Sequence, residues 1–240
     1  MELENSESYL DDDEDDLDEY LEESLNSLDK ISGLQEFMEF CKELNERVDE
    51  DDVPNVIIES QAEHQKYFEQ LKAFNYPADF LEWHEKHGHV YLWLETTKVV
   101  QSKTVLEELH SDWFSLLTHN GFLFLTTDAA GNAYVIDTNV QAPQIKFAAH
   151  EEMYFGDATI PNIYSEFYEF EVGADGQIQK NPKNLDTNLI FDENGSFISD
   201  SVYLEDYYAQ KLKSCGCTSF LEFLKERLRT GLIEYYVLDV

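Results

Sequence analysis

The pattern of residues 122–138 constrains the fold more than any other part of the chain. Two apolar runs, 122–127 and 133–137, flank a short loop that contains Gly131. Apolar runs joined by a short glycine-containing loop predict a β-hairpin. The first run, FLFLTT, is apolar on both faces, and such a strand is typical of positions that other elements cover on both sides. We therefore predict a central hairpin in a sheet that is packed on both faces.

Helical periodicity precedes this hairpin. Apolar residues recur every three or four positions over 17–48, which indicates one apolar stripe along a helix. Ser32-Gly33 predicts a break that divides this stretch into two helices. A second helical pattern covers about 59–73. The region before the strands is therefore expected to be mainly helical.

Proline and glycine residues mark the ends of the elements around the hairpin. Pro77 suits the first turn of a helix, and Gly88 suits the position just past its end. Residues 89–94 then alternate in the manner of a strand. A short helix is expected over 104–110, and a further strand is expected over 144–148.

The last part of the sequence contains a well-marked helix. Ser219 and Glu222 have the spacing of a capping box, in which each side chain accepts a free backbone N–H of the other residue. Gly231 is expected to end this helix. Residues 151–200 are rich in aromatics and turn signals, which indicates further hairpins and long loops. Because helical patterns lie mainly at the two ends, the sequence predicts an α+β fold, with helices packed at the side and ends of a mostly antiparallel sheet.

Charge is unevenly distributed along the chain. Acidic residues outnumber basic ones by 51 to 16, which gives a formal net charge of −35. A run such as DDDEDD repels itself and has nothing apolar to bury, so we expect a disordered acidic tail over 1–16. The expected organisation continues with a helical segment over 17–58 and an α+β domain over 59–240. The tail has two interpretations: it keeps the chain soluble, or it attracts a basic partner.

The charge also excludes several classes of function. A polyanion repels phosphate backbones and anionic lipid headgroups, so we expect neither direct nucleic-acid binding nor adsorption to a membrane. No stretch approaches the roughly 20 apolar residues of a membrane span, and the first ten residues lack the basic and apolar regions of a secretory signal. The odd count of three cysteines fits a reducing compartment, so we expect a cytoplasmic protein.

The order of these parts resembles that of the SUKH superfamily, the Smi/Knr-type domain. The resemblance covers about residues 60–230 and leaves 1–58 outside it. The matching pieces are the proline-led helix PADFLEWHEKHG, the strand HVYLWLETTKVV, the hairpin FLFLTTDAAGNAYVIDTN, the late strand APQIKFAAHEE and the terminal helix SFLEFL.

The resemblance implies a non-enzymatic role. Many bacterial SUKH proteins are immunity proteins that neutralise a toxin, often a nuclease, and eukaryotic relatives act as interaction scaffolds. Nucleases have basic clefts for their substrates, and an acidic inhibitor complements such a cleft while electrostatic steering raises its association rate. We therefore expect an immunity protein that occludes a basic cognate toxin stoichiometrically, and the alternative is a scaffold or regulatory interaction module. The expected partner contacts are acids close to aromatics in the sequence: Glu82, Glu85, Asp128, Glu166, Glu169, Glu205 and Asp206.

The sequence has few features that are typical of catalytic, nucleotide-binding or metal-binding sites. The sequence contains no P-loop, GxGxxG, GxSxG or HExxH motif, so no catalytic activity, metal or cofactor is expected. His84 and His87 are either two zinc ligands on one helical face or residues of the core and the turn. Cys215 and Cys217 form either a redox or metal pair or a tight turn of small residues. The aromatics of 164–170 are either core residues or an aromatic rim for a partner.

Overall fold

The computed structural model describes most of the 240-residue chain. The described residues are 12–46, 54–58, 64–94, 97–111, 114–155, 160–161, 163, 167–172, 178–183 and 202–238. The helices are α1 (Asp12–Lys30), α2 (Leu34–Asn45), α3 (His64–Leu71), α4 (Ala78–His87), α5 (Ser102–Leu109), α6 (Ser115–His119), α7 (His150–Met153), α9 (Val202–Lys211) and α10 (Phe220–Leu238). The strands are β1 (Asn55–Ile58), β2 (Val90–Leu94), β3 (Thr97–Val99), β4 (Phe122–Asp128), β5 (Ala133–Asp137), β6 (Gln144–Ala148), β7 (Tyr154–Phe155), β8 (Ile160–Pro161), β9 (Tyr168–Val172), β10 (Ile178–Pro182) and β11 (Lys213–Ser214).

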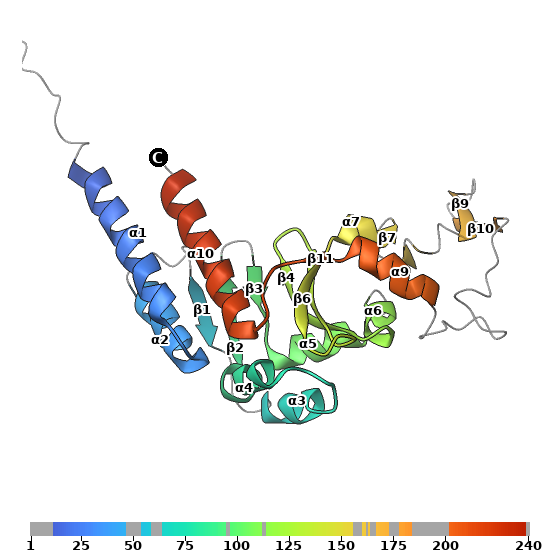
Figure 1. Cartoon of the computed structure of the whole chain (residues 1–240), viewed down its shortest axis with the longest axis horizontal. Helices are drawn as coiled ribbons and strands as arrows, with labels where there is room; N and C mark the ends of the chain where they lie inside the picture. The colour runs from blue at the N-terminus through green and yellow to red at the C-terminus, as the bar shows by residue number, and fades with distance from the viewer. Residues whose placement is uncertain are drawn as a thin grey trace, which may run out of the picture.

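Seven strands form one sheet in the order β1-β2-β3-β4-β5-β6-β11. Every neighbouring pair is antiparallel. The pairs β9–β10 and β7–β8 form two small antiparallel ribbons outside this sheet, and β9–β10 flanks a turn signal of the predicted kind. Helices surround the sheet (Figure 1), so the predicted α+β fold with a mostly antiparallel sheet is confirmed.

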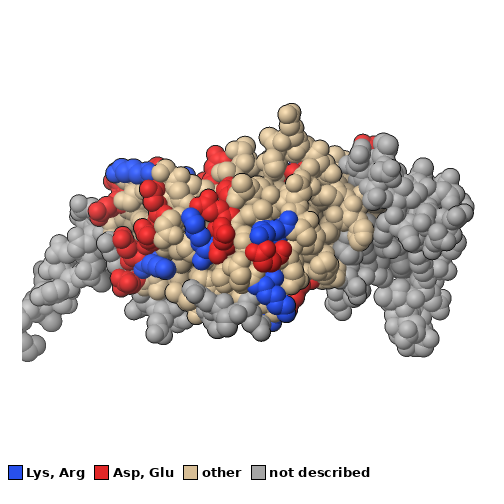
Figure 2. Space-filling view, turned by 90° about the horizontal axis from the view of Figure 1, so that it is seen from below, with Lys and Arg blue, Asp and Glu red and all other residues tan. Residues whose placement is uncertain are grey.

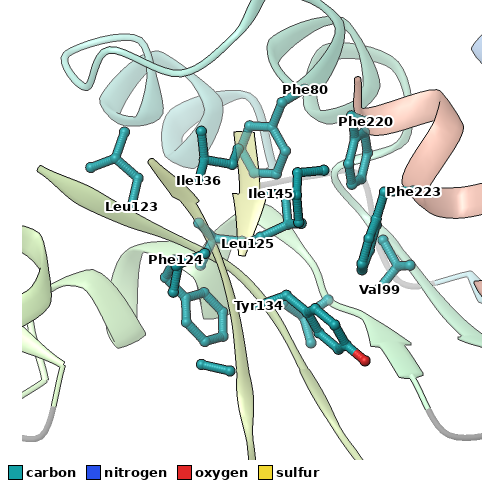
Figure 3. Close-up of a cluster of buried hydrophobic side chains, with 14 of the residues drawn as sticks. Phe80, Val99, Leu123, Phe124, Leu125, Tyr134, Ile136, Ile145, Phe220 and Phe223 are labelled. Carbon is teal, nitrogen blue, oxygen red and sulfur yellow. The ribbon is translucent and has the colours of Figure 1, made fainter. Parts of the chain in front are cut away.

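The predicted central hairpin is β4–β5, and other elements cover both of its faces. Phe124 pairs with Val135, and its ring meets the edge of Phe114 at a centroid distance of 5.3 Å. Tyr134 adjoins Val135 in the strand and so points to the opposite face. There its ring lies 5.0 Å from that of Phe223 on α10 (Figure 3). The hairpin is thus the middle layer between α10 on one side and the α5–α6 region on the other.

Helix α4 begins after Pro77 and ends at His87, as the sequence predicts. Gly88 follows it with a φ of −65°, so its role is not to adopt a left-handed backbone. A Cβ at this position would collide with the Ser102 hydroxyl oxygen and the His84 carbonyl oxygen. The Ser102 N–H donates to the Gly88 carbonyl at 2.9 Å. The glycine therefore allows the end of α4 to approach the start of α5.

The N-terminal helices belong to the same core as the sheet. The break predicted at Ser32-Gly33 separates α1 from α2. Helix α1 begins at Asp12, so residues 12–16 of the expected tail are helical, at a helix N-terminus where the dipole favours acidic side chains. The expected boundary at residue 58 coincides with the end of β1, a strand of the main sheet. The buried residues of α1 and α2 include Leu28, Leu34, Phe37, Met38, Cys41 and Leu44.

Helix α10 follows the predicted pattern only in part. The Glu222 N–H donates to Ser219 Oγ at 3.1 Å, which is one half of the predicted capping box. The Glu222 carboxylate, however, accepts the N–H of Thr218 at 2.8 Å. The prediction that Gly231 ends the helix is wrong, because α10 continues to Leu238. Gly231 is buried, and the apolar face continues after it, so packing outweighs the low helix propensity of glycine.

One carboxylate caps both α4 and α10. Asp79 Oδ2 accepts the N–H of Phe220 at 2.6 Å, and Asp79 Oδ1 accepts the N–H of Phe80 at 2.9 Å. The first N–H groups of a helix lack partners within it, and the helix dipole favours negative charge at that end. Asp79 therefore stabilises two helix starts and fixes them beside each other. The Phe80 and Phe220 rings meet there at 5.2 Å.

Two basic side chains of α10 hold α1, and these two long helices lie side by side at one end of the molecule (Figure 1). Lys225 Nζ donates to the carbonyl oxygens of Asp29 at 3.0 Å and Ile31 at 2.8 Å. Arg229 forms an ion pair with the Asp29 carboxylate. The last carbonyls of a helix lack intrahelical donors, so Lys225 caps the C-terminus of α1 from another element.

We expect Lys225→Met to lower the free energy of unfolding by about 1 kcal/mol, because the variant keeps the aliphatic stem but loses the donors to α1. Urea unfolding measures this loss, and amide exchange should become faster within α1. Lys103→Met is the matched control, since the ion pair that Lys103 forms among the described residues, with Glu107 at 3.7 Å, is exposed. An equal effect of the two substitutions would contradict the capping role.

Candidate functional site

Two of the predicted contact residues lie on the exposed side of α4. Glu82 and Glu85 are both exposed, one turn apart along the helix. Glu82 pairs with Lys86 at 2.7 Å, so part of its charge is offset within the helix. The backbone carbonyl of Glu85 lies 3.1 Å from His64 Nε2, while its carboxylate faces outward. Glu85 is therefore the better placed of the two to meet a partner.

Asp128 is half-buried and supports the β4–β5 turn. Its Oδ1 accepts the N–H groups of Ala130 at 3.0 Å and Asn132 at 2.8 Å, and its Oδ2 accepts Asn132 Nδ2 at 2.8 Å. Gly131 completes the turn with a φ of +83°. An aspartate that opens a turn typically bonds to the backbone two residues on, and this local signal is visible in the sequence. The Asp128 carboxylate is thus already occupied by three hydrogen bonds.

The other described contact candidates lie toward the end of the molecule that is far from α1 and α10 (Figure 1). Glu169 is exposed on β9 and Asp206 is exposed on α9. Glu205 belongs to α9, and Glu166 lies outside the described residues. In Figure 1, β9 and α9 lie far from α4. The structure therefore does not bring the predicted acids together in one patch.

The aromatic residues near these acids are mostly interior. Phe167, Tyr207 and Tyr208 are buried, and Tyr168 is half-buried. The Tyr208 ring lies 5.2 Å from the ring of Phe122, so α9 packs onto β4. For these residues the core interpretation holds. Tyr164 lies outside the described residues.

The histidines around the end of α4 are also interior. His84 is fully buried, and its Nδ1 lies 2.9 Å from Ser102 Oγ. Burial, helped by the charge of His64, lowers the pKa of His84 to about 3. Burial also lowers the pKa of His87 to about 4, with nearby Lys42 adding to the effect. Within the described part of the chain, no group of three or more His, Cys, Asp or Glu side chains is arranged to hold a metal.

Cys215 and Cys217 flank a tight turn at the edge of the sheet. The Cys215 N–H donates to the Ile145 carbonyl at 3.1 Å, the Ile145 N–H donates to the Cys217 carbonyl at 3.4 Å, and Gly216 has a φ of +77°. Both thiols are free, and burial raises the pKa of Cys215 to about 11. A protonated thiol is a poor nucleophile and metal ligand. The arrangement matches the turn interpretation.

The described surface is acidic because acids outnumber bases by 51 to 16 in the chain, and many of the basic groups are already paired within it. Ion pairs or helix-capping bonds engage Lys72, Lys86, Lys103, Lys146, Lys213, Lys225 and Arg229. Helix α1 alone contains ten acidic residues and one lysine. Figure 2 shows carboxylates recurring along one face, with fewer basic groups between them. The surplus carboxylates thus have few basic side chains to neutralise them.

The sequence interpretation missed strand β1. Residues 17–58 were expected to form a helical segment, yet Asn55–Ile58 forms an edge strand of the main sheet. The signal was present as three consecutive β-branched residues, Val56, Ile57 and Ile58, which favour extended backbone. Ile57 and Ile58 are 49% and 59% exposed. An apolar edge strand is therefore part of the exposed surface that a partner could contact.

The fold and surface define a class: an α+β protein with many exposed acids and a sheet edge at β1 on which no other described strand pairs. Comparison of the chain with protein-family models, curated proteins and solved structures finds no match. Among the described residues, no helix combines the length and the apolar character that crossing a membrane requires.

Proposed function

We propose that this protein is a cytoplasmic, non-enzymatic binding protein that captures a basic protein partner. More specifically, the proposal is an immunity protein of the SUKH type, which neutralises a cognate toxin by stoichiometric occlusion. The resemblance in sequence supplies the family, and the confirmed α+β architecture is compatible with it. A basic nuclease is the favoured toxin, because its cleft must bind phosphates.

The observation that supports this proposal most is the excess of carboxylates that form no ion pair with a lysine or arginine of the described chain. Several lysines and arginines among the described residues form ion pairs or cap helices of this chain, as Lys225 does for α1. Exposed acids such as Glu85, Glu169 and Asp206 remain on the surface. Such a surface attracts basic proteins over a range set by the salt concentration and lets carboxylates take the places of substrate phosphates.

A scaffold or regulatory module is the second candidate, in which the acidic N-terminus recruits the partner. Deleting 1–55 does not separate the two candidates, because it also removes the buried residues of α1 and α2 from the core. Deletion of 1–11 leaves every described element intact. An immunity protein of the proposed kind should keep its protection after this deletion, whereas a tail-borne scaffold should lose its partner.

Co-expression with a toxin encoded immediately upstream tests the proposal directly. The protein should rescue cells from that toxin and not from unrelated ones. For the purified pair, the association rate constant should fall by about tenfold or more between roughly 0.05 and 0.5 M NaCl, because salt screens steering. Stopped-flow fluorescence measures this rate. A salt-independent rate would remove the electrostatic mechanism, and failure to rescue from any neighbouring toxin would favour the scaffold.

A further inference from the structure

Strand β1 lies at the edge of the sheet, and no other described strand pairs with its outer side. It pairs with β2 on its other side, with Ile57 opposite Tyr91 and Ile58 opposite Val90. The Val56 N–H points away from β2 and donates to Asn45 Oδ1 of α2 at 2.8 Å. Backbone groups in an antiparallel strand alternate between the two sides, so the Ile58 N–H and C=O also point away from β2. Asn45 therefore covers one position of this edge, and the next outward position follows at Ile58.

The side chains of this edge are unusual for an unpaired strand. Natural sheets protect their edges with very short strands, charged residues, prolines or bulges, because an open edge pairs with other chains. At four residues, β1 has the first of these protections. Strand β1 reads Asn55-Val-Ile-Ile58 and contains no charge and no proline. Two of the four exposed large apolar side chains among the described residues, Ile57 and Ile58, lie on it. They project to opposite faces of the sheet, so both faces of the edge are apolar.

The described residues of α2 beside this edge include both signs of charge, with exposed Lys42 and with more acids than bases toward its end. On α2, which contacts β1 through Asn45, Glu43 and Glu46 are exposed. An apolar strand edge with exposed acids at its flank is complementary to a strand that alternates basic and apolar residues.

We propose that β1 is the docking site for an extended basic segment of the protein partner, which adds to the main sheet as a further strand beside Ile58. Backbone hydrogen bonds at the edge supply affinity, and the flanking acids select for lysine and arginine. This inference rests on the proposed function in one respect, that the partner is basic. A second copy of the chain is disfavoured as occupant, because pairing of two such edges would bring Glu43 and Glu46 of both copies together in proteins of charge −35.

The test uses the full chain and a synthetic peptide of alternating lysine and valine, about seven residues long. The peptide should bind with an affinity that falls as salt rises, and the Ile58 amide should gain protection from hydrogen exchange. A peptide of alternating glutamate and valine should not bind. A lysine–valine peptide that is N-methylated along one backbone edge keeps the charge but cannot extend the sheet, so it should bind more weakly.

Two substitutions locate the site. Ile58→Lys places a repelling charge on the edge, and Ile58→Pro removes the outward N–H, so each should weaken binding of the lysine–valine peptide by about tenfold or more. Ile233→Lys is the control, because Ile233 is 40% exposed on α10 and the charge change is the same. Circular dichroism verifies that each variant is folded.

Equal weakening by Ile58→Lys and Ile233→Lys, or full affinity of the N-methylated peptide, would overturn the edge site and leave the proposed capture of a basic partner standing. Concentration-dependent dimers that Ile58→Lys abolishes would also overturn it, since the edge would then pair with its own copy. Rescue from the cognate toxin by Ile58→Lys at wild-type level would likewise exclude this edge. Failure of the wild type to rescue from any toxin counts against the proposed function instead.

Discussion

Trp83→Ala should lower the free energy of unfolding by about 3–5 kcal/mol, the usual cost of deleting a large buried aromatic side chain. Trp83 is fully buried on α4 and joins three elements. Its ring lies 6.4 Å from Phe37 of α2 and 5.9 Å from Phe220 of α10, both in edge-to-face geometry. The cavity would open where these helices meet, so α2, α4 and α10 would lose contacts together. Urea unfolding followed by circular dichroism measures the change.

Two variants make this prediction specific. Trp93 is half-buried on β2, on the face opposite the buried Leu92. Trp93→Ala should therefore lower the free energy of unfolding clearly less than Trp83→Ala. Trp83→Phe should also cost less than Trp83→Ala, since it keeps an aromatic ring and removes an indole N–H that has no hydrogen-bond partner among the described residues. If Trp83→Ala cost no more than Trp93→Ala, α4 would not be the centre of the helical packing.

Local patterns accounted for most of the fold. The hairpin at β4–β5, the bounds of α4 and the strand at 144–148 follow from apolar alternation and from proline and glycine placement, which act within a few residues. The end of α10 did not follow, because burial of Gly231 depends on contacts with distant elements. Asp79 illustrates the same limit, since it caps Phe220 across 141 positions of sequence.

The candidate surface was harder to predict than the fold. In a chain with 51 acids, composition cannot say which carboxylates are exposed or paired. Asp128 is occupied by its own turn and Glu82 by Lys86, whereas Glu85 is exposed and in no ion pair with the described residues. Strand β1 was missed because four residues are too few for a reliable alternation, and its place at the edge depends on pairing with β2.

Acid should destabilise this protein from about pH 6.5 downward, well above the range in which carboxylates titrate. Burial lowers the pKa of His84 to about 3, whereas an unfolded histidine titrates near 6.5. Between these values the unfolded chain binds a proton at this position and the folded chain does not, so stability rises with pH. The pKa of His87, lowered to about 4, acts in the same direction. Lowered pKa values of Glu36, Glu69, Glu152 and Glu222 add acid sensitivity only nearer pH 4.5.

His84→Gln isolates this contribution, because the amide retains a hydrogen-bonding group toward Ser102 but does not titrate. The variant should be less stable than the wild type at pH 7.5. Below pH 6, however, its free energy of unfolding should fall less steeply with acid than that of the wild type, and the two slopes should differ by about 1.4 kcal/mol per pH unit. Urea unfolding between pH 7.5 and 5 measures both slopes, and repulsion among the surface carboxylates is common to the two proteins and cancels. Ser102→Ala should keep the wild-type slope, since burial and not the Ser102 hydroxyl is the main cause of the lowered pKa. Equal slopes for His84→Gln and the wild type would mean that His84 titrates alike in the folded and unfolded chains.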